Sequence, residues 1–269
     1  MAERRNWTRE EILVAMALYH QIPFGKIGRN NPEIISLAKV LGRTPSALAM
    51  KMCNLASFDQ TLRDRNVNGL SNGSKLDKEI WQEFAGRTEE IAIRSAEIVA
   101  ELKEKNIEEE SYNDGFAVNE SIYDDLPYVI GGESIAQRKE RIGHRFFHNA
   151  VLSSYENGCC ITGVKVPELL RASHIKPWAV STPEEKTNPA NGLCLNALHD
   201  AAFDKGLITV RTDFSICVSD KLKKYERMDD SMRKLLIESE GTKIILPHRF
   251  QPAKEFLEYH NDLIFQHGW

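Results

Sequence analysis

The spacing of apolar residues predicts a helical first part of the chain and a later part built from short strands and helices. In the first part, Ile12, Met16 and Tyr19 recur at helical spacing. Thr8 precedes this run, and Glu11 lies three positions after Thr8, which is the capping-box pattern that begins a helix. The chain therefore opens with a well-signalled helix.

Two more helices are predicted before residue 58. Pro32 suits the first turn of one, which Gly42 ends, and Thr44-Pro45 begins the other. Three helices over about residues 7–58 resemble Myb/SANT-like and helix-turn-helix modules, whose third helix can enter the major groove of DNA. A structural or protein-interaction module is the alternative interpretation. The candidates for DNA recognition are Arg43, Ser46, Lys51 and Asn54.

Apolar residues at helical spacing predict a long helix over about 77–105, which Gly86 and Thr88 break or kink. Residues 104–125 then contain eight acidic residues and one basic residue. Such a stretch buries too little apolar surface to fold by itself. We therefore expect a helical region over 1–105, an acidic linker over 106–135 and a second domain over 136–269.

The second domain begins with a basic helix over about 137–158 and continues with two strand signals. LLRASHI at 169–175 alternates between two faces, and GLCLN at 192–196 is an apolar run of strand length. Asn196 is a good helix cap, and Gly206 lies where a helix stop is expected. The pattern predicts two antiparallel strands joined by a long loop and followed by a short helix.

Three polar residues lie at defined points of this pattern. His174 is near the end of the first strand, Asn191 is at the start of the second, and His199 is one turn into the helix, at spacings of 17 and 8 residues. Hydrolysis of a phosphodiester needs a base that activates water, and imidazole has a suitable pKa. It also needs a divalent cation that neutralises charge on the phosphate. If the three side chains converge, they suit this chemistry.

The strings ASHIKPW, NGLCLN and LHDAAFDKG, in this order, resemble the core of the HNH nucleases, the ββα-metal superfamily of metal-dependent phosphodiesterases. The resemblance is good over about 137–269 and looser over 7–85. It implies an α+β fold, with a ββα-metal (HNH) nuclease domain and a mostly helical N-terminal domain. It implies that His174 is the general base, that Asn191 pins the loop and orients the base, and that His199 binds the metal. Products with 5′-phosphate and 3′-hydroxyl ends are also implied.

The chain departs from the HNH pattern at the second metal ligand. Many HNH proteins have Asp or His just before the base histidine, where this chain has Ser173. Asp204 is the nearest acidic replacement, but on a continuous helix it points about 140° away from His199. It reaches the same ion only if the helix ends first, which Gly206 favours, and Ser173 is the weaker alternative. We expect Mg²⁺ as the cofactor, with Mn²⁺, Ni²⁺ and Zn²⁺ as alternatives.

Cationic side chains near the predicted site are candidates for binding DNA phosphates. Three belong to the core motif, and two lie on the basic helix that precedes it. They are Arg171, Lys176, Lys205, Arg141 and Arg145.

Composition refines this picture only slightly. A net charge of −4 argues against a general nucleic-acid coat protein, but local patches rather than the total charge govern phosphate binding. The five cysteines form no CxxC pair, which predicts buried reduced thiols rather than a zinc knuckle. The sequence contains no 18-residue apolar run, and its start lacks the apolar stretch of a signal peptide. We therefore expect a cytoplasmic protein that has DNA rather than a membrane as its partner.

The expected function is that of a metal-dependent DNA endonuclease. A role in restriction or anti-phage defence follows by analogy with HNH proteins of similar composition. Cutting both strands with one active site per chain would favour a homodimer. Two other interpretations stay open. One is a DNA-binding regulator with an inactive HNH fold, motivated by Ser173. The other is a protein-interaction module with a structural metal, motivated by the acidic linker.

Overall fold

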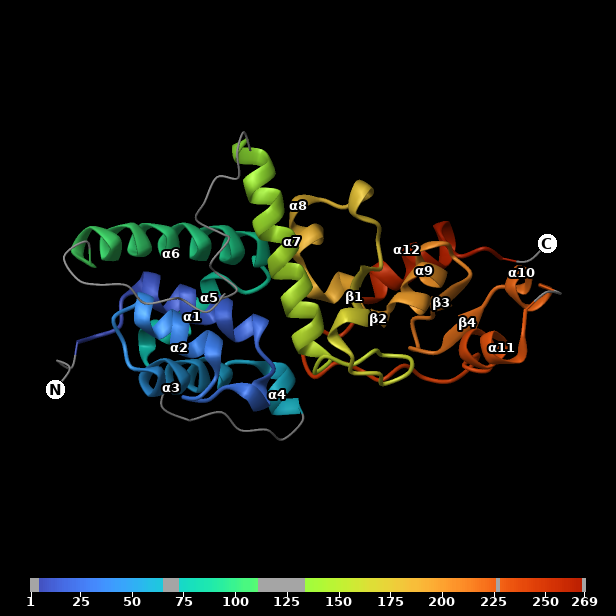
Figure 1. The fold of residues 1–269 in the computed structure, drawn as a ribbon, viewed down its shortest axis with the longest axis horizontal. Coiled ribbons are helices and arrows are strands. Elements are labelled where there is room, and N and C mark those ends of the chain that lie inside the picture. The colour runs from blue at the N-terminus through green and yellow to red at the C-terminus, as the bar shows by residue number, and fades with distance from the viewer. Residues whose placement is uncertain (1–4, 65–72, 111–133, 226–227, 268–269) are drawn as a thin grey trace. The chain divides into compact units, whose positions relative to one another are not determined.

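The structure, a computed structural model, describes residues 5–64, 73–110, 134–225 and 228–267 (Figure 1). The chain divides into two compact units, Met1–Phe146 and Phe147–Trp269. Helices and two small antiparallel sheets make up the described residues, so the predicted α+β fold class is confirmed. The predicted linker over 106–135 lies largely outside the described residues.

The first unit is helical in its described part. Gly86, at a φ of 76°, separates two helices where one broken or kinked helix was predicted. The second of these helices runs to Glu110, beyond the predicted end near residue 105. The helices are α1 (Arg9–Gln21), α2 (Pro32–Val40), α3 (Pro45–Ala56), α4 (Gln60–Asp64), α5 (Lys75–Glu83), α6 (Thr88–Glu110) and α7 (Ile135–Ser154), which continues into the second unit.

Helix α1 is the centre of the first unit. It contacts α3, α5 and α6, and its residues from Glu11 to His20 are all buried. The predicted capping box is present, because the Thr8 hydroxyl accepts from Glu11 N at 3.2 Å and the Glu11 carboxylate accepts from Thr8 N at 3.0 Å. A helix that is buried on every face belongs to the core of its unit rather than to its surface.

Two of the four DNA-recognition candidates are engaged in internal ion pairs. Arg43 donates to the Glu11 carboxylate from Nε at 3.0 Å and from Nη2 at 2.7 Å. Lys51 Nζ lies 2.7 and 3.0 Å from the oxygens of Asp77, which is fully buried. Both cations also lie against the ring of Trp7. The predicted DNA contacts of Arg43 and Lys51 are therefore not supported, because carboxylates of the same unit already neutralise both charges.

The remaining surface of α3 offers little electrostatic attraction for DNA. Ser46 is exposed and Asn54 is half-buried, and their DNA contacts stay predictions. Lys51 is the only cationic residue in the α3 sequence, and it is buried. Phosphate binding depends mainly on Lys and Arg side chains, so these observations favour a structural or protein-interaction role for α3.

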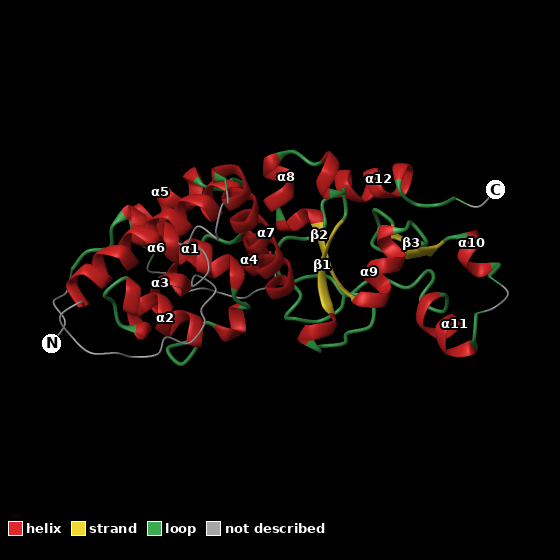
Figure 2. Ribbon diagram, turned by 45° about the horizontal axis from the view of Figure 1, so that its top comes forward, coloured by secondary structure: helices red, strands yellow, loops and turns green. Residues whose placement is uncertain are grey.

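The second unit contains the predicted strand pair and the helix that follows it (Figure 2). Strand β1 pairs antiparallel with β2, and β3 pairs antiparallel with β4. The predicted strands and short helix are confirmed. In chain order, the elements are β1 (Leu170–His174), α8 (Pro183–Thr187), β2 (Gly192–Asn196), α9 (Ala197–Asp204), β3 (Ile208–Val210), β4 (Ile216–Val218), α10 (Asp220–Lys223), α11 (Asp230–Leu236) and α12 (Lys254–Leu263).

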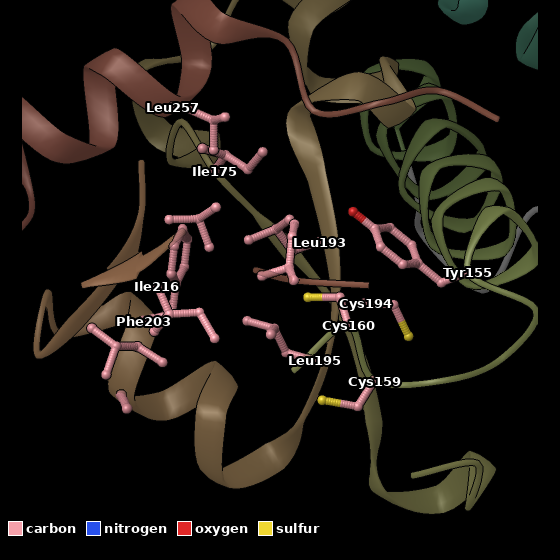
Figure 3. Close-up of a cluster of buried hydrophobic side chains, with 14 of the residues drawn as sticks. Tyr155, Cys159, Cys160, Ile175, Leu193, Cys194, Leu195, Phe203, Ile216 and Leu257 are labelled. Carbon is pink, nitrogen blue, oxygen red and sulfur yellow. The ribbon is translucent and has the colours of Figure 1, made fainter. Parts of the chain in front are cut away.

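An apolar core lies between these elements and includes three cysteines, Cys159, Cys160 and Cys194 (Figure 3). All three are buried free thiols, as the sequence predicted. Burial raises the pKa of Cys194 to about 12 and raises the pKa of Cys160 well above its usual value. Cys160 and Cys194 therefore stay protonated and act as small apolar residues.

The end of α9 is fixed by Gly206 and His260. Gly206 has a φ of 64°, and a Cβ there would lie 2.0 Å from the carbonyl oxygen of Ile264, so the predicted glycine stop is confirmed. The buried ring of His260 stacks on Phe203 at 3.7 Å and donates from Nε2 to the Phe203 carbonyl at 3.1 Å. Its Nδ1 accepts from the Thr209 hydroxyl at 2.8 Å.

The buried Lys51–Asp77 pair leads to a stability prediction. Lys51→Met should lower the free energy of unfolding by about 3 kcal/mol, because Asp77 keeps a buried charge that has lost its partner. Lys75→Met is the control, since Lys75 and Glu79 form an exposed pair at 3.7 Å. Urea unfolding followed by far-UV circular dichroism measures both variants. Similar small losses in the two would contradict the assigned role of the buried pair.

Burial lowers the pKa of His260 to about 4. The folded protein keeps this ring neutral, whereas the unfolded chain protonates it below its ordinary pKa of about 6.5. Stability should therefore fall as pH drops from about 6.5 to about 4, with a contribution near 3 kcal/mol from this residue. Unfolding of wild type and His260→Gln should show a shallower pH dependence in the variant. His267→Gln, at an exposed position, is the control.

Candidate functional site

The candidate site is built on the β1–β2 hairpin and α9. His174 pairs with Gly192 at one end of the hairpin, and Leu170 pairs with Asn196 at the other end. Asn196 then caps α9, because its Oδ1 accepts from Leu198 N at 3.1 Å and from His199 N at 3.0 Å. The helix therefore starts at the end of the hairpin that is opposite to His174.

His174 is held by contacts on several sides. Its ring stacks on Phe147 with centroids 3.7 Å apart and planes 11° apart, and the ring of Trp178 meets it edge-on at 5.4 Å. Its Nε2 lies 3.0 Å from the carbonyl oxygen of Lys186. A carbonyl only accepts hydrogen bonds, so Nε2 carries a proton, and when the ring is neutral its basic lone pair is on Nδ1. The tautomer is therefore set by the loop.

The close stacking of His174 depends on Gly192. A Cβ at position 192 would lie 2.4 Å from Val151 Cγ2 and 2.9 Å from Phe147 Cζ, distances that real Cβ atoms do not show. Only glycine lets α7 approach β2 this closely. Because His174 pairs with Gly192, the same approach brings Phe147 against the imidazole ring.

Asn191 is fully buried and holds the loop between the strands. Its Oδ1 accepts from Lys176 N at 2.8 Å. Its Nδ2 donates to the carbonyl of Lys176 at 3.2 Å and to that of Glu185 at 3.1 Å. Its backbone carbonyl accepts from Ile175 N at 2.9 Å, next to His174. These contacts are those of a residue that pins the loop, and any part in catalysis stays a prediction.

His199 lies in the first turn of α9, which starts at the end of the hairpin opposite to His174. It is fully buried, with Nδ1 3.0 Å from Asn196 Oδ1 and Nε2 2.9 Å from the Leu235 carbonyl. Burial lowers the pKa of His199, although the Leu235 carbonyl favours the charged ring. Each ring nitrogen thus faces a protein oxygen, an arrangement that fits a structural role better than metal binding.

The structure brings Ser173 and Asp204 together instead. Ser173 is 3% exposed, and its hydroxyl has no hydrogen-bond partner among the described residues. It lies beside the Asp204 carboxylate, outside ordinary hydrogen-bond geometry but near enough to favour the charged form and so lower the pKa of that group. Partial burial, followed by the nearby Asp200, raises the pKa of Asp204 more strongly. Carboxylate and hydroxyl oxygens suit a hard divalent cation, so these residues fit a metal of that kind.

The predicted phosphate-binding cations differ in availability. Arg171 and Lys205 are exposed. Lys176 forms a half-buried ion pair with Glu185 at 2.6 Å, so its predicted phosphate contact is not supported, because a phosphate would have to displace that carboxylate. Arg141 and Arg145 lie on α7 in the first unit, and their contacts with DNA stay predictions.

Sequence reasoning missed Lys186. Its ammonium group lies 4.8 Å from the centre of the Trp178 ring, and its carbonyl fixes His174. The signal for its position was the capping-box string from Thr182 to Glu185, which begins α8 and turns the loop back toward β1. The contact with His174 itself depends on the fold of the loop and has no signature in residue spacing.

A strand pair followed by a helix, with a histidine at the end of the first strand, is the arrangement of a ββα nuclease core. Residues 159–211 match a family model described as HNH endonuclease, a span that contains β1, β2, α9 and β3. This part of the chain is therefore an HNH-type nuclease domain. No match was found among curated proteins. None of the described helices is long and apolar enough to cross a membrane.

Proposed function

We propose that this protein is a divalent-metal-dependent DNA endonuclease that hydrolyses phosphodiester bonds. The observation that carries the proposal is the placement of His174 in the matched domain. Its neutral tautomer is set by the Lys186 carbonyl, and its ring is clamped by Phe147 and Trp178. A fixed imidazole with a defined basic nitrogen is what general-base catalysis requires.

In this proposal, His174 Nδ1 takes a proton from the attacking water, while Nε2 keeps its proton on the Lys186 carbonyl. Asn191 holds the loop that supplies this carbonyl. A divalent cation bound beside Ser173 and Asp204 would neutralise charge on the phosphate and the leaving oxygen. Departure of the 3′ oxygen gives 5′-phosphate and 3′-hydroxyl ends, as the family resemblance implies.

A role in restriction or anti-phage defence is the biological form of this proposal. The alternative is a DNA-binding regulator with an inactive HNH fold. One observation favours the alternative, since Ser173 stands where an acidic metal ligand is common. The two functions differ in a simple outcome, because the regulator binds DNA but does not cut it with any divalent metal.

The first functional prediction concerns the base. His174→Ala should reduce cleavage by at least about a hundredfold, the usual effect of losing a general base, while DNA binding is kept. Nicking of supercoiled plasmid with Mg²⁺, Mn²⁺ or EDTA measures cleavage, and His267→Ala is the control. If His174→Ala cuts as fast as wild type, another group is the base. Binding without cutting by wild type would favour the regulator.

A second prediction concerns Lys186, which we propose as a DNA phosphate contact next to the base. Lys186→Gln should weaken DNA binding about equally for unrelated sequences and reduce the slope of log affinity against log salt by about 1. Lys254→Gln, an exposed lysine on α12, is the matched control. Fluorescence anisotropy over a salt series in EDTA measures both. An unchanged slope in Lys186→Gln would rule out this contact.

A further inference from the structure

The geometry of α9 shows that His199 and Asp204 cannot hold the same ion. The helix is continuous from Ala197 to Asp204. Five residues along an α-helix turn the side chain by about 140°, so the two side chains point in widely different directions. His199 points into the core toward Asn196 and the Leu235 carbonyl, whereas Asp204 is exposed and near Ser173. At most one of the two, His199 or Asp204, can therefore be a ligand of the metal ion.

Asp200 lies on the same face of α9 as Asp204. Residues four apart on a helix are neighbours, with Cβ atoms about 5–6 Å apart. A like-charged pair at this spacing destabilises a helix unless a cation offsets the repulsion. The helix dipole favours an acidic residue in the first turn, which explains Asp200 but does not explain a second carboxylate at Asp204.

The buried hydroxyl of Ser173 is a second feature that points to a cation beside these carboxylates. A buried hydroxyl normally has a hydrogen-bond partner, because leaving it unsatisfied costs about 1–3 kcal/mol. Ser173 is 3% exposed, and its Oγ lies beside the Asp204 carboxylate without the geometry of an ordinary hydrogen bond. A ligand that accepts its lone pair and joins both carboxylates would satisfy the hydroxyl and offset the repulsion.

We propose that Asp200, Asp204 and the Ser173 hydroxyl form an all-oxygen site for a hard divalent cation, and that His199 is a structural residue. The proposal rests on the proposed nuclease function and names the ligands of its metal. It replaces the imidazole that the family resemblance implied by a second carboxylate. Mg²⁺ is commonly bound by one or two carboxylates together with waters and substrate phosphates, which this site allows.

The choice of ligands has a consequence for metal selectivity. Oxygen donors suit Mg²⁺ and Mn²⁺, whereas an imidazole ligand would favour Ni²⁺ and Zn²⁺. His199 instead ties the first turn of α9 to the Leu235 carbonyl at the end of α11. In this arrangement, the buried ring keeps α9 in place, and the opposite side of the helix presents its carboxylates to the ion.

Direct metal binding tests the site without relying on cleavage. The full chain is titrated with Mn²⁺, and the free ion is measured by electron paramagnetic resonance. Asp200→Asn and Asp204→Asn should each weaken Mn²⁺ affinity about tenfold or more, and Ser173→Ala should weaken it to a smaller extent. His199→Gln should leave the affinity unchanged while lowering the melting temperature. Asp262→Asn, an exposed aspartate on α12, is the charge-matched control.

Unchanged Mn²⁺ affinity in Asp200→Asn and Asp204→Asn would overturn the proposal, as would loss of binding in a folded His199→Gln. The two aspartate variants decide the question even if His199→Gln does not fold. A wild-type protein that binds Mn²⁺ through both aspartates but cuts no DNA would keep this site and reject the nuclease. If wild type cleaves DNA and both aspartate variants bind Mn²⁺ with normal affinity, the nuclease function is kept and this metal site is rejected.

Discussion

The geometry around the candidate base depends on one buried amide, that of Asn191. Its side chain satisfies three backbone groups from two separate points of the loop. The Lys176–Glu185 ion pair and the cap of α8 close the same loop from within. Together they hold the Lys186 carbonyl that selects the tautomer of His174. Asn191 contacts no substrate in the proposed mechanism, but it thus determines which ring nitrogen of the proposed base His174 carries the proton.

The cationic side chains of the two units differ in their surroundings. In the first unit, Arg43 and Lys51 are directed inward, where they neutralise buried carboxylates and stabilise the helix packing. In the second unit, Lys176 is also paired, but Arg171 and Lys205 are exposed, and Lys186 lies on an aromatic ring beside the base. A chain of net charge −4 can therefore still attract phosphate locally at its nuclease domain.

Much of the fold could be predicted from the sequence because its signals are local. The Thr8–Glu11 capping box, the Asn196 cap and the Gly206 stop each act within a few residues, and each is present as expected. The ion pairs of Arg43 and Lys51 could not be predicted, since their partners lie 32 and 26 residues away and depend on tertiary packing. Helical geometry revealed the conflict between His199 and Asp204, but only the burial of His199 indicates which one faces solvent.

The buried thiols in the apolar core of the second unit affect how readily the protein is oxidised. Oxidation to sulfenic acid begins from an accessible thiolate, and Cys159, Cys160 and Cys194 are buried, with the pKa of the last two raised. Peroxide and alkylating reagents should therefore react first at the half-buried Cys217, since burial also raises the pKa of the half-buried Cys53. The hairpin that carries His174 is in this way insulated from oxidative stress by the same packing that gives it its shape.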